Sequence, residues 1–181
     1  MATTFAQLTV EEFDRLPESD RKCELNDGVL VEVEMARAEH ELVKISFNSL
    51  LVTALAGSEF LVAPEAVNRL SARTSRVPDL ALWRRSDLKK MDLAHTIVGG
   101  PYIAIEVVSS ETAEELDEKI QQYFAAGTKA VWIVYPRTRA IVIENLEGLE
   151  RLTLRDTLQA PDLLPGLKIR VADVFALLDQ S

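Results

Sequence analysis

The segment from Pro101 to Pro136 constrains the fold of this chain more than any other. Two apolar runs, PYIAIEVV and AVWIVYP, flank a polar stretch that opens with Thr112 and Glu115, the spacing of a capping box. That stretch ends at Gly127, where a left-handed helix stop is expected. The pattern predicts a strand, a crossover helix and a second strand that is buried on both faces. We therefore expect a mixed α/β fold.

The first 36 residues predict a helix and a β-hairpin. Thr9 and Glu12 form another capping box, before a short helical pattern that ends at Pro17. The Asn-Asp-Gly sequence at 26–28 separates two strand-like pieces, and the second piece, 29–35, alternates between Val or Met and mostly acidic residues. This alternation is typical of a hairpin with one solvent-exposed face.

Residues 38–181 predict the core together with a C-terminal strand and helix. No Gly or Pro occurs from Ala38 to Ala56, and apolar residues recur there at helical spacing, which predicts a core-facing helix that ends at Gly57. Three strands are expected next, in FLVAPEAVNRL, VPDLALW and PYIAIEVV. After AVWIVYP, the expected elements are strands in AIVIENL and LRDTL, then a strand and helix in LPGLKIRVADVFALL.

Length and composition indicate one globular domain over residues 1–181. The chain has 181 residues, of which 48% are hydrophobic and 27% charged, and it contains no linker or repeat. No apolar run approaches the ~18 residues of a membrane span, and the first segment does not resemble a signal peptide, so we expect a cytoplasmic protein without membrane contact. The single Cys23 allows no internal disulfide. A Gly-rich phosphate loop is absent, which disfavours a nucleotide cofactor.

Two acidic residues stand inside apolar strand segments. Asp79 lies in VPDLALW and Glu106 lies in YIAIEVV. Burial of an unpaired carboxylate costs several kcal/mol, so a carboxylate retained there usually meets a cation, hydrogen-bond donors or a metal. Each residue taken alone could make a structural ion pair, for example with Arg76 or Arg84. Two of them on neighbouring strands favour a functional site.

Lys119 adds a third group, on the predicted helix that follows the Glu106 strand. Gln122 and Tyr123 follow it at i+3 and i+4, on nearly the same helix face. Paired carboxylates suit Mg²⁺, and a nearby lysine can orient water or stabilise charge that develops on a phosphate. The three residues together predict metal-assisted phosphodiester hydrolysis. Lys119 alone would more simply be a solvated helix residue.

This order of residues resembles the PD-(D/E)XK nuclease superfamily, and more closely the Uma2 family of restriction-endonuclease-like proteins. The matching features span nearly the whole chain, although each piece is short. They are ELNDGVL, His40, VPDLALW, IEVVSSET, Lys119 and Tyr123 before Gly127, VWIVYP, and LPGLKIRVADVF. The resemblance implies a restriction-endonuclease-like core, an α/β (α+β) fold in which helices flank a mixed central sheet.

The resemblance also implies roles for individual residues. Asp79 and Glu106 would hold Mg²⁺ or Mn²⁺, with the backbone carbonyl of Val107 as a further ligand. The superfamily lysine stands two positions after the glutamate, where this chain has Val108, so the resemblance implies a relocated lysine at Lys119. If Lys119 points away, the site is degenerate. The expected site neighbours are Glu24, His40, Gln122 and Tyr123, although His40 taken alone is more often a core or capping residue.

The charge is distributed unevenly. The chain has 20 basic and 29 acidic residues, a net charge of −9, which disfavours a uniformly basic nucleic-acid binder. Between residues 69 and 90, seven basic residues accompany two acidic ones, a local net of +5 that leaves −14 for the rest. This segment could contact DNA phosphates, or its charges could pair with the acidic remainder. The candidates for DNA contact are Arg69, Arg73, Arg76, Arg84 and Arg85.

The leading hypothesis is therefore a Mg²⁺-dependent endonuclease that hydrolyses DNA phosphodiester bonds through Asp79, Glu106 and Lys119. The alternative is a catalytically silent domain that keeps the nuclease fold for nucleic-acid or protein binding, as Val108 and the acidic total suggest. Hydrolysis of another phosphoester by the same metal site is a third possibility. By analogy with symmetric nucleases that cut both strands, we expect a homodimer.

Overall fold

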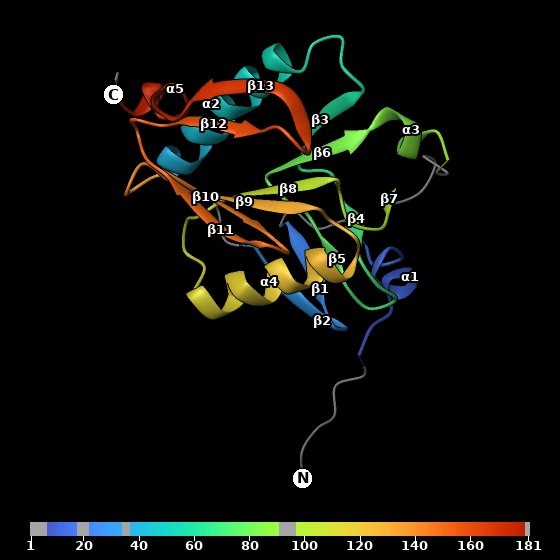
Figure 1. The fold of residues 1–181 in the computed structure, drawn as a ribbon. Helices are drawn as coiled ribbons and strands as arrows, with labels where there is room; N and C mark the ends of the chain where they lie inside the picture. The colour runs from blue at the N-terminus through green and yellow to red at the C-terminus, as the bar shows by residue number, and fades with distance from the viewer. Residues whose placement is uncertain (1–6, 18–21, 34–36, 91–96, 180–181) are drawn as a thin grey trace.

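The computed structural model describes residues 7–17, 22–33, 37–90 and 97–179. Its centre is a six-stranded sheet with the strand order β11-β10-β9-β8-β6-β3 (Figure 1). Only β8 and β9 run parallel, and the other neighbours are antiparallel. The strands are β3 (Phe60–Pro64), β6 (Leu80–Arg84), β8 (Ile103–Val107), β9 (Ala130–Tyr135), β10 (Ala140–Asn145) and β11 (Gly148–Leu152).

Two smaller sheets flank this centre. One has the order β2-β1-β5-β4-β7, and the other pairs β12 with β13. Their strands are β1 (Cys23–Asn26), β2 (Val29–Glu32), β4 (Asn68–Arg69), β5 (Ser75–Arg76), β7 (Ile97–Val98), β12 (Thr157–Ala160) and β13 (Leu164–Arg170). The helices are α1 (Val10–Phe13), α2 (Ala38–Ala54), α3 (Arg85–Leu88), α4 (Ala113–Ala125), α5 (Val171–Val174) and a final 3₁₀ turn (Ala176–Asp179). Within the described ranges, no helix combines the length and apolar character needed to cross a membrane.

The predicted crossover is confirmed. Strand β8 leads into α4, and α4 leads back into β9, which pairs with β8 in parallel. Thr112 caps α4 through its hydroxyl, which accepts from the Glu115 N–H, and Glu115 accepts the Thr112 N–H in return. Gly127 adopts a φ of 97°, the left-handed conformation expected at the helix stop. This unit places α4 against the strand that carries Glu106.

Loss of the Thr112 cap is expected to destabilise the fold. Replacement of Thr112 with Ala removes the acceptor of the Glu115 N–H in the first turn of α4, which should lower the free energy of unfolding by about 1 kcal/mol. Urea unfolding followed by circular dichroism measures this. The matched control is Thr53→Ala, at an exposed threonine inside α2 whose hydroxyl donates to the Ser49 carbonyl and caps no helix. Equal effects of the two substitutions would contradict the capping argument.

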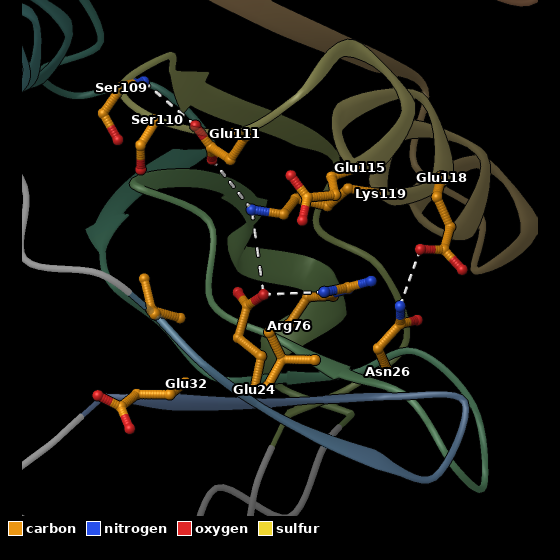
Figure 2. A pocket seen from close by; sticks show the side chains of 12 residues that line it. Glu24, Asn26, Glu32, Arg76, Ser109, Ser110, Glu111, Glu115, Glu118 and Lys119 are labelled. Atoms are coloured by element: carbon orange, nitrogen blue, oxygen red, sulfur yellow. Dashed lines mark hydrogen bonds and ion pairs between the residues drawn. The ribbon is translucent and has the colours of Figure 1, made fainter.

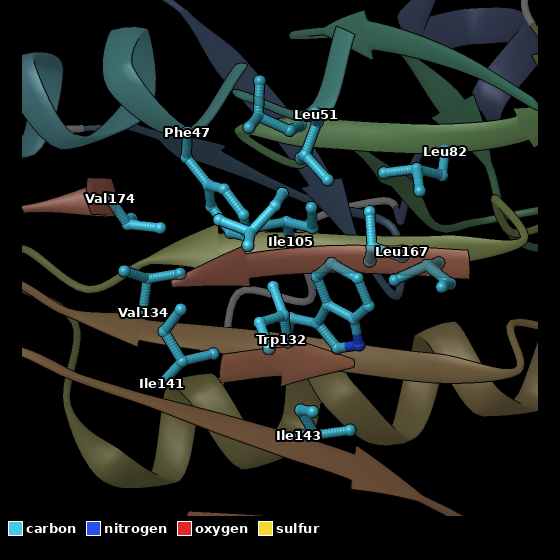
Figure 3. Packing of buried hydrophobic residues seen from close by; sticks show 14 of the residues in the cluster. Phe47, Leu51, Leu82, Ile105, Trp132, Val134, Ile141, Ile143, Leu167 and Val174 are labelled. Carbon is cyan, nitrogen blue, oxygen red and sulfur yellow. The ribbon is translucent and has the colours of Figure 1, made fainter. Parts of the chain in front are cut away.

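The core lies on both faces of the central sheet. On one face, α2 and the β12–β13 hairpin pack over Trp132, whose ring stacks on Phe47 at a centroid distance of 6.1 Å (Figure 3). On the other face, α4 buries Leu116 and Ile120 against Val131 and other residues of β8 and β9. Figure 1 shows these two layers above and below β8 and β9. The architecture is the expected mixed α/β (α+β) fold, with helices on both sides of the sheet.

Several local predictions need correction. The hairpin forms around Asp27 and Gly28, whose φ angles are both positive, but β2 is exposed along its whole length, not on one face only. The FLVAPEAVNRL segment is split into β3 and β4 by Glu65, which has a φ of 50°. LRDTL is mostly a turn before β12, and β11 was not predicted. Strand β1 also pairs with β5, which joins the N-terminal hairpin to the core.

Candidate active site

Asp79 and Glu106 meet at one end of the antiparallel pair β6 and β8. The register joins Leu80 to Ile105, and extension by one residue places Asp79 opposite Glu106. Side chains opposite each other in such a pair start about 5 Å apart. Asp79 is 7% exposed and Glu106 is 3% exposed, so both carboxylates are buried as the sequence predicted.

The Asp79 carboxylate is held by donors from two elements. Its Oδ2 accepts the Val107 N–H at 2.7 Å and lies 3.0 Å from His40 Nε2 at the start of α2. Burial opposes ionisation of Asp79, but the hydrogen bond and charge of His40 outweigh it, so the pKa of Asp79 lies below its ordinary value. Burial likewise opposes protonation of His40, and Asp79 outweighs it and raises the pKa of His40. His40 therefore borders the site.

Glu106 points toward α4, where its surroundings disfavour its negative charge. Its Oε1 accepts the Tyr123 hydroxyl at 2.7 Å, and its Oε2 lies 3.8 Å from Lys119 Nζ. Burial, together with the negative charges of Asp79 and Glu24, raises the pKa of Glu106 to about 8 even though Lys119 opposes the shift. A further cation beside Glu106 would therefore favour its negative charge, which burial opposes.

Lys119 reaches the carboxylates from α4. Its Nζ lies 3.4 Å from Glu111 Oε1, 3.8 Å from Glu106 Oε2 and 4.0 Å from Glu24 Oε2. Figure 2 shows the Lys119 side chain between Glu111 and Glu24. Burial disfavours the ammonium, but the three carboxylates outweigh it and raise the pKa of Lys119. Lys119 does not point away into solvent, as a solvated helix residue would.

A buried ion pair between Glu24 and Arg76 lies beside the site. The Glu24 carboxylate accepts Arg76 Nη1 and the Val77 N–H, each at 2.9 Å, and both charged side chains are about 5% exposed or less. Arg76 Nε donates to Gln122 on α4 at 2.8 Å, and Gln122 donates in turn to Asn26 on β1 at 2.7 Å. This network ties β1 and β5 to α4.

The donor set fits a hydrated divalent cation but not an all-protein cage. In the described ranges, no three His, Cys, Asp or Glu side chains are arranged to hold a metal together. Mg²⁺ is commonly bound by one or two carboxylates, with water and substrate phosphate as its other ligands. Asp79 and Glu106 supply two buried carboxylates, and the raised pKa of Glu106 marks a place where a cation would be stabilising. Hence the two residues suit Mg²⁺ or Mn²⁺.

Two comparisons with known proteins identify the family and the fold of the chain. The Uma2 family model, described as "Putative restriction endonuclease", matches residues 10–172, about nine tenths of the chain. The chain belongs to the Uma2 family. It is also similar to a solved structure described as a putative nuclease belonging to DUF820, from Anabaena variabilis ATCC 29413, with a TM-score of 0.82 and 18% sequence identity. The alignment covers 94% of this chain and 99% of that one, which shows a shared fold. No curated protein matches the chain.

Within this Uma2 chain, the structure brings together most of the predicted site residues. Asp79, Glu106 and Lys119 converge, and Glu24, His40, Gln122 and Tyr123 each contact one of them or the Arg76 network. Val107, which follows Glu106 on β8, is buried and donates its N–H to Asp79. The sequence analysis missed Glu111, whose position in the connection before α4 carries no pattern that distinguishes it from a capping or solvated residue.

The five candidate arginines do not form one surface. Arg76 is buried in the Glu24 pair, and Arg84 lies over the Tyr102 ring and donates to its hydroxyl at 2.7 Å. Arg84 and Arg85 stand at the opposite end of β6 from Asp79, about 16 Å along the strand. Arg69 and Arg73 lie beside the N-terminal segment, where they contact Glu11 and Gln7.

A pocket of about 290 Å³ opens beside Lys119 (Figure 2). Carboxylates outnumber cations along its walls, because five glutamates accompany only Arg76 and Lys119. The glutamates are Glu24, Glu32, Glu111, Glu115 and Glu118. An approaching phosphate therefore meets an acidic rim, and its binding would benefit from an added cation.

The stability of the metal-free protein should fall as the pH rises from about 4.5 to about 8. Glu106 has an ordinary pKa of 4.5 and a pKa of about 8 in the fold, so the folded state binds its proton more tightly than the unfolded state does. This proton contributes stability that is lost as the pH rises, on the order of a few kcal/mol. His40 acts in the same direction above pH 6.5, whereas Asp79 matters only below 3.8.

Urea unfolding in EDTA at pH 6 and at pH 8.5 measures this loss. Glu106→Gln removes the titrating carboxyl and should leave only the smaller contribution of His40. Saturating Mg²⁺ should reduce the loss in the wild type, because an ion that binds the ionised carboxylates stabilises the folded state. A wild-type protein that loses as little stability as Glu106→Gln would contradict the raised pKa.

Proposed function

We propose that this protein is a metal-dependent endonuclease that hydrolyses DNA phosphodiester bonds. The observation that carries the proposal is the convergence of two buried carboxylates and one ammonium at the end of β6 and β8, with Lys119 Nζ 3.8 Å from Glu106 Oε2. Membership of a family described as "Putative restriction endonuclease" supports the same reaction class. Mg²⁺ or Mn²⁺ is the proposed cofactor.

Each residue of the site has a proposed role in this reaction. Asp79 and Glu106 hold the divalent ion, with the Val107 carbonyl as a further ligand, and the bound ion supplies Lewis acidity toward the phosphate and the attacking water. Lys119 orients that water and stabilises the negative charge that develops on the phosphate. His40 holds Asp79 and Tyr123 holds Glu106, each through a hydrogen bond of 3.0 Å or less. The fixed carboxylates thereby keep their geometry through turnover.

The alternative, a catalytically silent domain, requires a degenerate site. A lysine more than ~8 Å from both carboxylates would favour it, since that gap exceeds direct contact or one bridging water. The position of Lys119 instead supports catalysis, in spite of Val108 at the usual lysine position. Hydrolysis of a different phosphoester by the same residues is the second candidate, and the acidic pocket rim favours it over tight duplex binding.

Supercoiled plasmid tests the proposal. Purified protein with Mg²⁺ or Mn²⁺ should convert it to nicked and linear forms, and EDTA should abolish the conversion. A parallel panel of bis-p-nitrophenyl phosphate, p-nitrophenyl phosphate and oligonucleotides separates DNA cleavage from general phosphoesterase activity. Turnover of the small phosphoesters without plasmid cleavage would replace the proposed function with the second candidate, and no turnover of any substrate would favour the silent domain.

We also propose that the active form is a homodimer. One candidate site per chain cuts one strand at a time, and a two-fold pair would present two sites to a duplex. Light scattering should then report twice the chain mass, with and without DNA. A monomer in both conditions would contradict the proposed dimer but would leave the proposed reaction of the site unaffected.

A further inference from the structure

Three carboxylates face the ammonium of Lys119, the group proposed to act on the phosphate. Nζ donates to Glu111 Oε1 at 3.4 Å, while Glu106 Oε2 and Glu24 Oε2 lie farther away, at 3.8 and 4.0 Å. The lysine side chain is 11% exposed, so little of it faces solvent. An ammonium has only three N–H donors. A phosphate that binds Lys119 must therefore take the place of one of these carboxylates.

Two of the three carboxylates are fixed by other partners. Glu24 accepts Arg76 Nη1 and the Val77 N–H, each at 2.9 Å. Glu106 accepts the Tyr123 hydroxyl at 2.7 Å. Both glutamates are 3% exposed, and displacement of either would break these bonds and leave its buried charge without a partner. We therefore expect these two carboxylates to keep their positions when a phosphate approaches.

Glu111 is held less firmly than the other two. It lies in the connection between β8 and α4, and its side chain is 26% exposed. Apart from Lys119, the partner of its carboxylate among the described residues is the Ser109 N–H, which donates to Oε2 at 3.1 Å from two residues away. Rotation of the side chain into solvent leaves no buried charge behind. Glu111 is thus the carboxylate that a phosphate can displace.

The contact between Glu111 and Lys119 lies at the pocket described above. Both residues line it, and the dashed line between them in Figure 2 marks their hydrogen bond. Lys119 also lies beside Glu106, so it connects the pocket with the carboxylates proposed to hold the metal ion. Carboxylate and phosphate oxygens both accept hydrogen bonds from an ammonium, and their negative charges repel each other. The two groups therefore compete for Lys119.

We propose that Glu111 determines the affinity of the site for phosphate, because its carboxylate occupies the place beside Lys119 that a substrate phosphate takes. The inference rests on the proposed function for the role of Lys119, and it adds a residue that weakens substrate binding. A substrate must break the Glu111–Lys119 hydrogen bond before it can accept from the ammonium. Removal of the Glu111 charge should therefore tighten the binding of phosphate.

Thymidine 3′,5′-bisphosphate tests the proposal without turnover, because a mononucleotide offers no internal phosphodiester bond to an endonuclease. Isothermal titration of the full chain in Mg²⁺ gives its Kd. Glu111→Gln keeps an acceptor for the Ser109 N–H but loses the charge. This variant should bind the bisphosphate about tenfold more tightly than the wild type, a factor typical of one charge-assisted hydrogen bond.

Two controls separate the contact with Lys119 from a general effect of charge. Glu118 also lines the pocket, but its carboxylate accepts the Asn26 amide at 2.8 Å and not the Lys119 ammonium. Glu118→Gln should change the Kd by no more than about twofold, since salt screens an exposed charge without direct contact. In a Lys119→Met background, Glu111→Gln should likewise gain no more than about twofold. If circular dichroism shows that Lys119→Met does not fold, Lys119→Gln takes its place.

The outcomes separate this inference from the proposed function. Plasmid cleavage by the wild type, with equal bisphosphate affinities of the wild type and Glu111→Gln, would overturn the inference and leave the proposed function standing. Tighter binding by Glu111→Gln without cleavage of any nucleic acid would support the inference and remove the proposed function.

Three other results would also overturn the inference. Weaker binding by Glu111→Gln would show that Glu111 positions Lys119 for the phosphate. An equal gain from Glu118→Gln, or an undiminished gain in the Lys119→Met background, would show that only the total charge matters. Binding of the bisphosphate to neither the wild type nor Glu111→Gln would show that Lys119 does not receive a phosphate.

Discussion

Asp79→Asn should abolish metal-dependent cleavage, with a loss of about 10³-fold or more in the single-turnover rate. Asparagine keeps the shape of the side chain and an oxygen that can accept the Val107 N–H and bond to His40, so the fold should persist. It removes one of the two negative charges proposed to hold the divalent ion. The loss of several kcal/mol of transition-state stabilisation corresponds to this factor, since each 1.36 kcal/mol changes the rate tenfold.

Quenched-flow cleavage of a labelled duplex, with enzyme in excess, measures the rate. The matched control is Asp87→Asn, which changes an aspartate of the same basic segment that pairs with Lys90 at the surface. This control should cut at the wild-type rate. Wild-type cleavage by Asp79→Asn, at a metal concentration that saturates neither protein, would remove Asp79 from the site. Recovery only at much higher Mn²⁺ would instead support its role as a metal ligand.

Arg76→Ala should lower the free energy of unfolding by about 3–5 kcal/mol, the cost of breaking a buried ion pair on one side. Arg76 is 4% exposed and Glu24 is 3% exposed, so a largely buried carboxylate would lose its 2.9 Å partner. The hydrogen bond from Arg76 to Gln122 would also be lost, which loosens α4 from β5. We expect this variant to be the least stable of the substitutions considered.

Two further variants show whether the loss of stability in Arg76→Ala comes from the unpaired Glu24 charge. Arg73→Ala, at an exposed arginine three residues earlier, should change the stability by no more than about 0.5 kcal/mol. The double variant Arg76→Ala/Glu24→Gln replaces the stranded charge with a neutral amide and should regain a substantial part of the lost stability. Denaturant titrations of all three variants in EDTA provide the comparison. A double variant no more stable than Arg76→Ala alone would show that lost packing, and not the stranded charge, dominates.

The β8–α4–β9 unit was predictable from the sequence because each of its parts has a local physical signal. The cap at Thr112, the stop at Gly127 and the apolar run of β9 determine the β8–α4–β9 unit within one contiguous segment. The predictions that needed correction concern strands whose structure depends on contacts with residues distant in the sequence. β2 is exposed along its whole length because no other layer of the described structure covers it, and alternation alone cannot indicate whether a layer covers a strand.

The part of the candidate site that was predictable is the pair of charged residues that stand inside apolar, buried strand segments. Asp79 and Glu106 stand out as carboxylates in apolar segments, and the structure buries both. Lys119 carries no such local signal, and it was singled out by its place on the helix after the Glu106 strand together with the resemblance to a family. Arg76 shows the limit of charge counting, because a residue in a basic segment was grouped with surface arginines while the fold pairs it with Glu24, 52 residues away.

The route by which Lys119 reaches Glu106 bears on how such sites change in evolution. Val108 follows Glu106 by two residues, so the two side chains leave the strand on the same face. This is the face that α4 covers, and Val108 packs against the hydrophobic cluster there. A lysine at either position thus starts from the same side of the sheet. A chain that carried both lysines for a time could transfer the role proposed for Lys119 from strand to helix with an ammonium present at every step. A search for related proteins should therefore weigh where the charge lies in space, since a rule of fixed spacing along the strand would pass over chains of this kind.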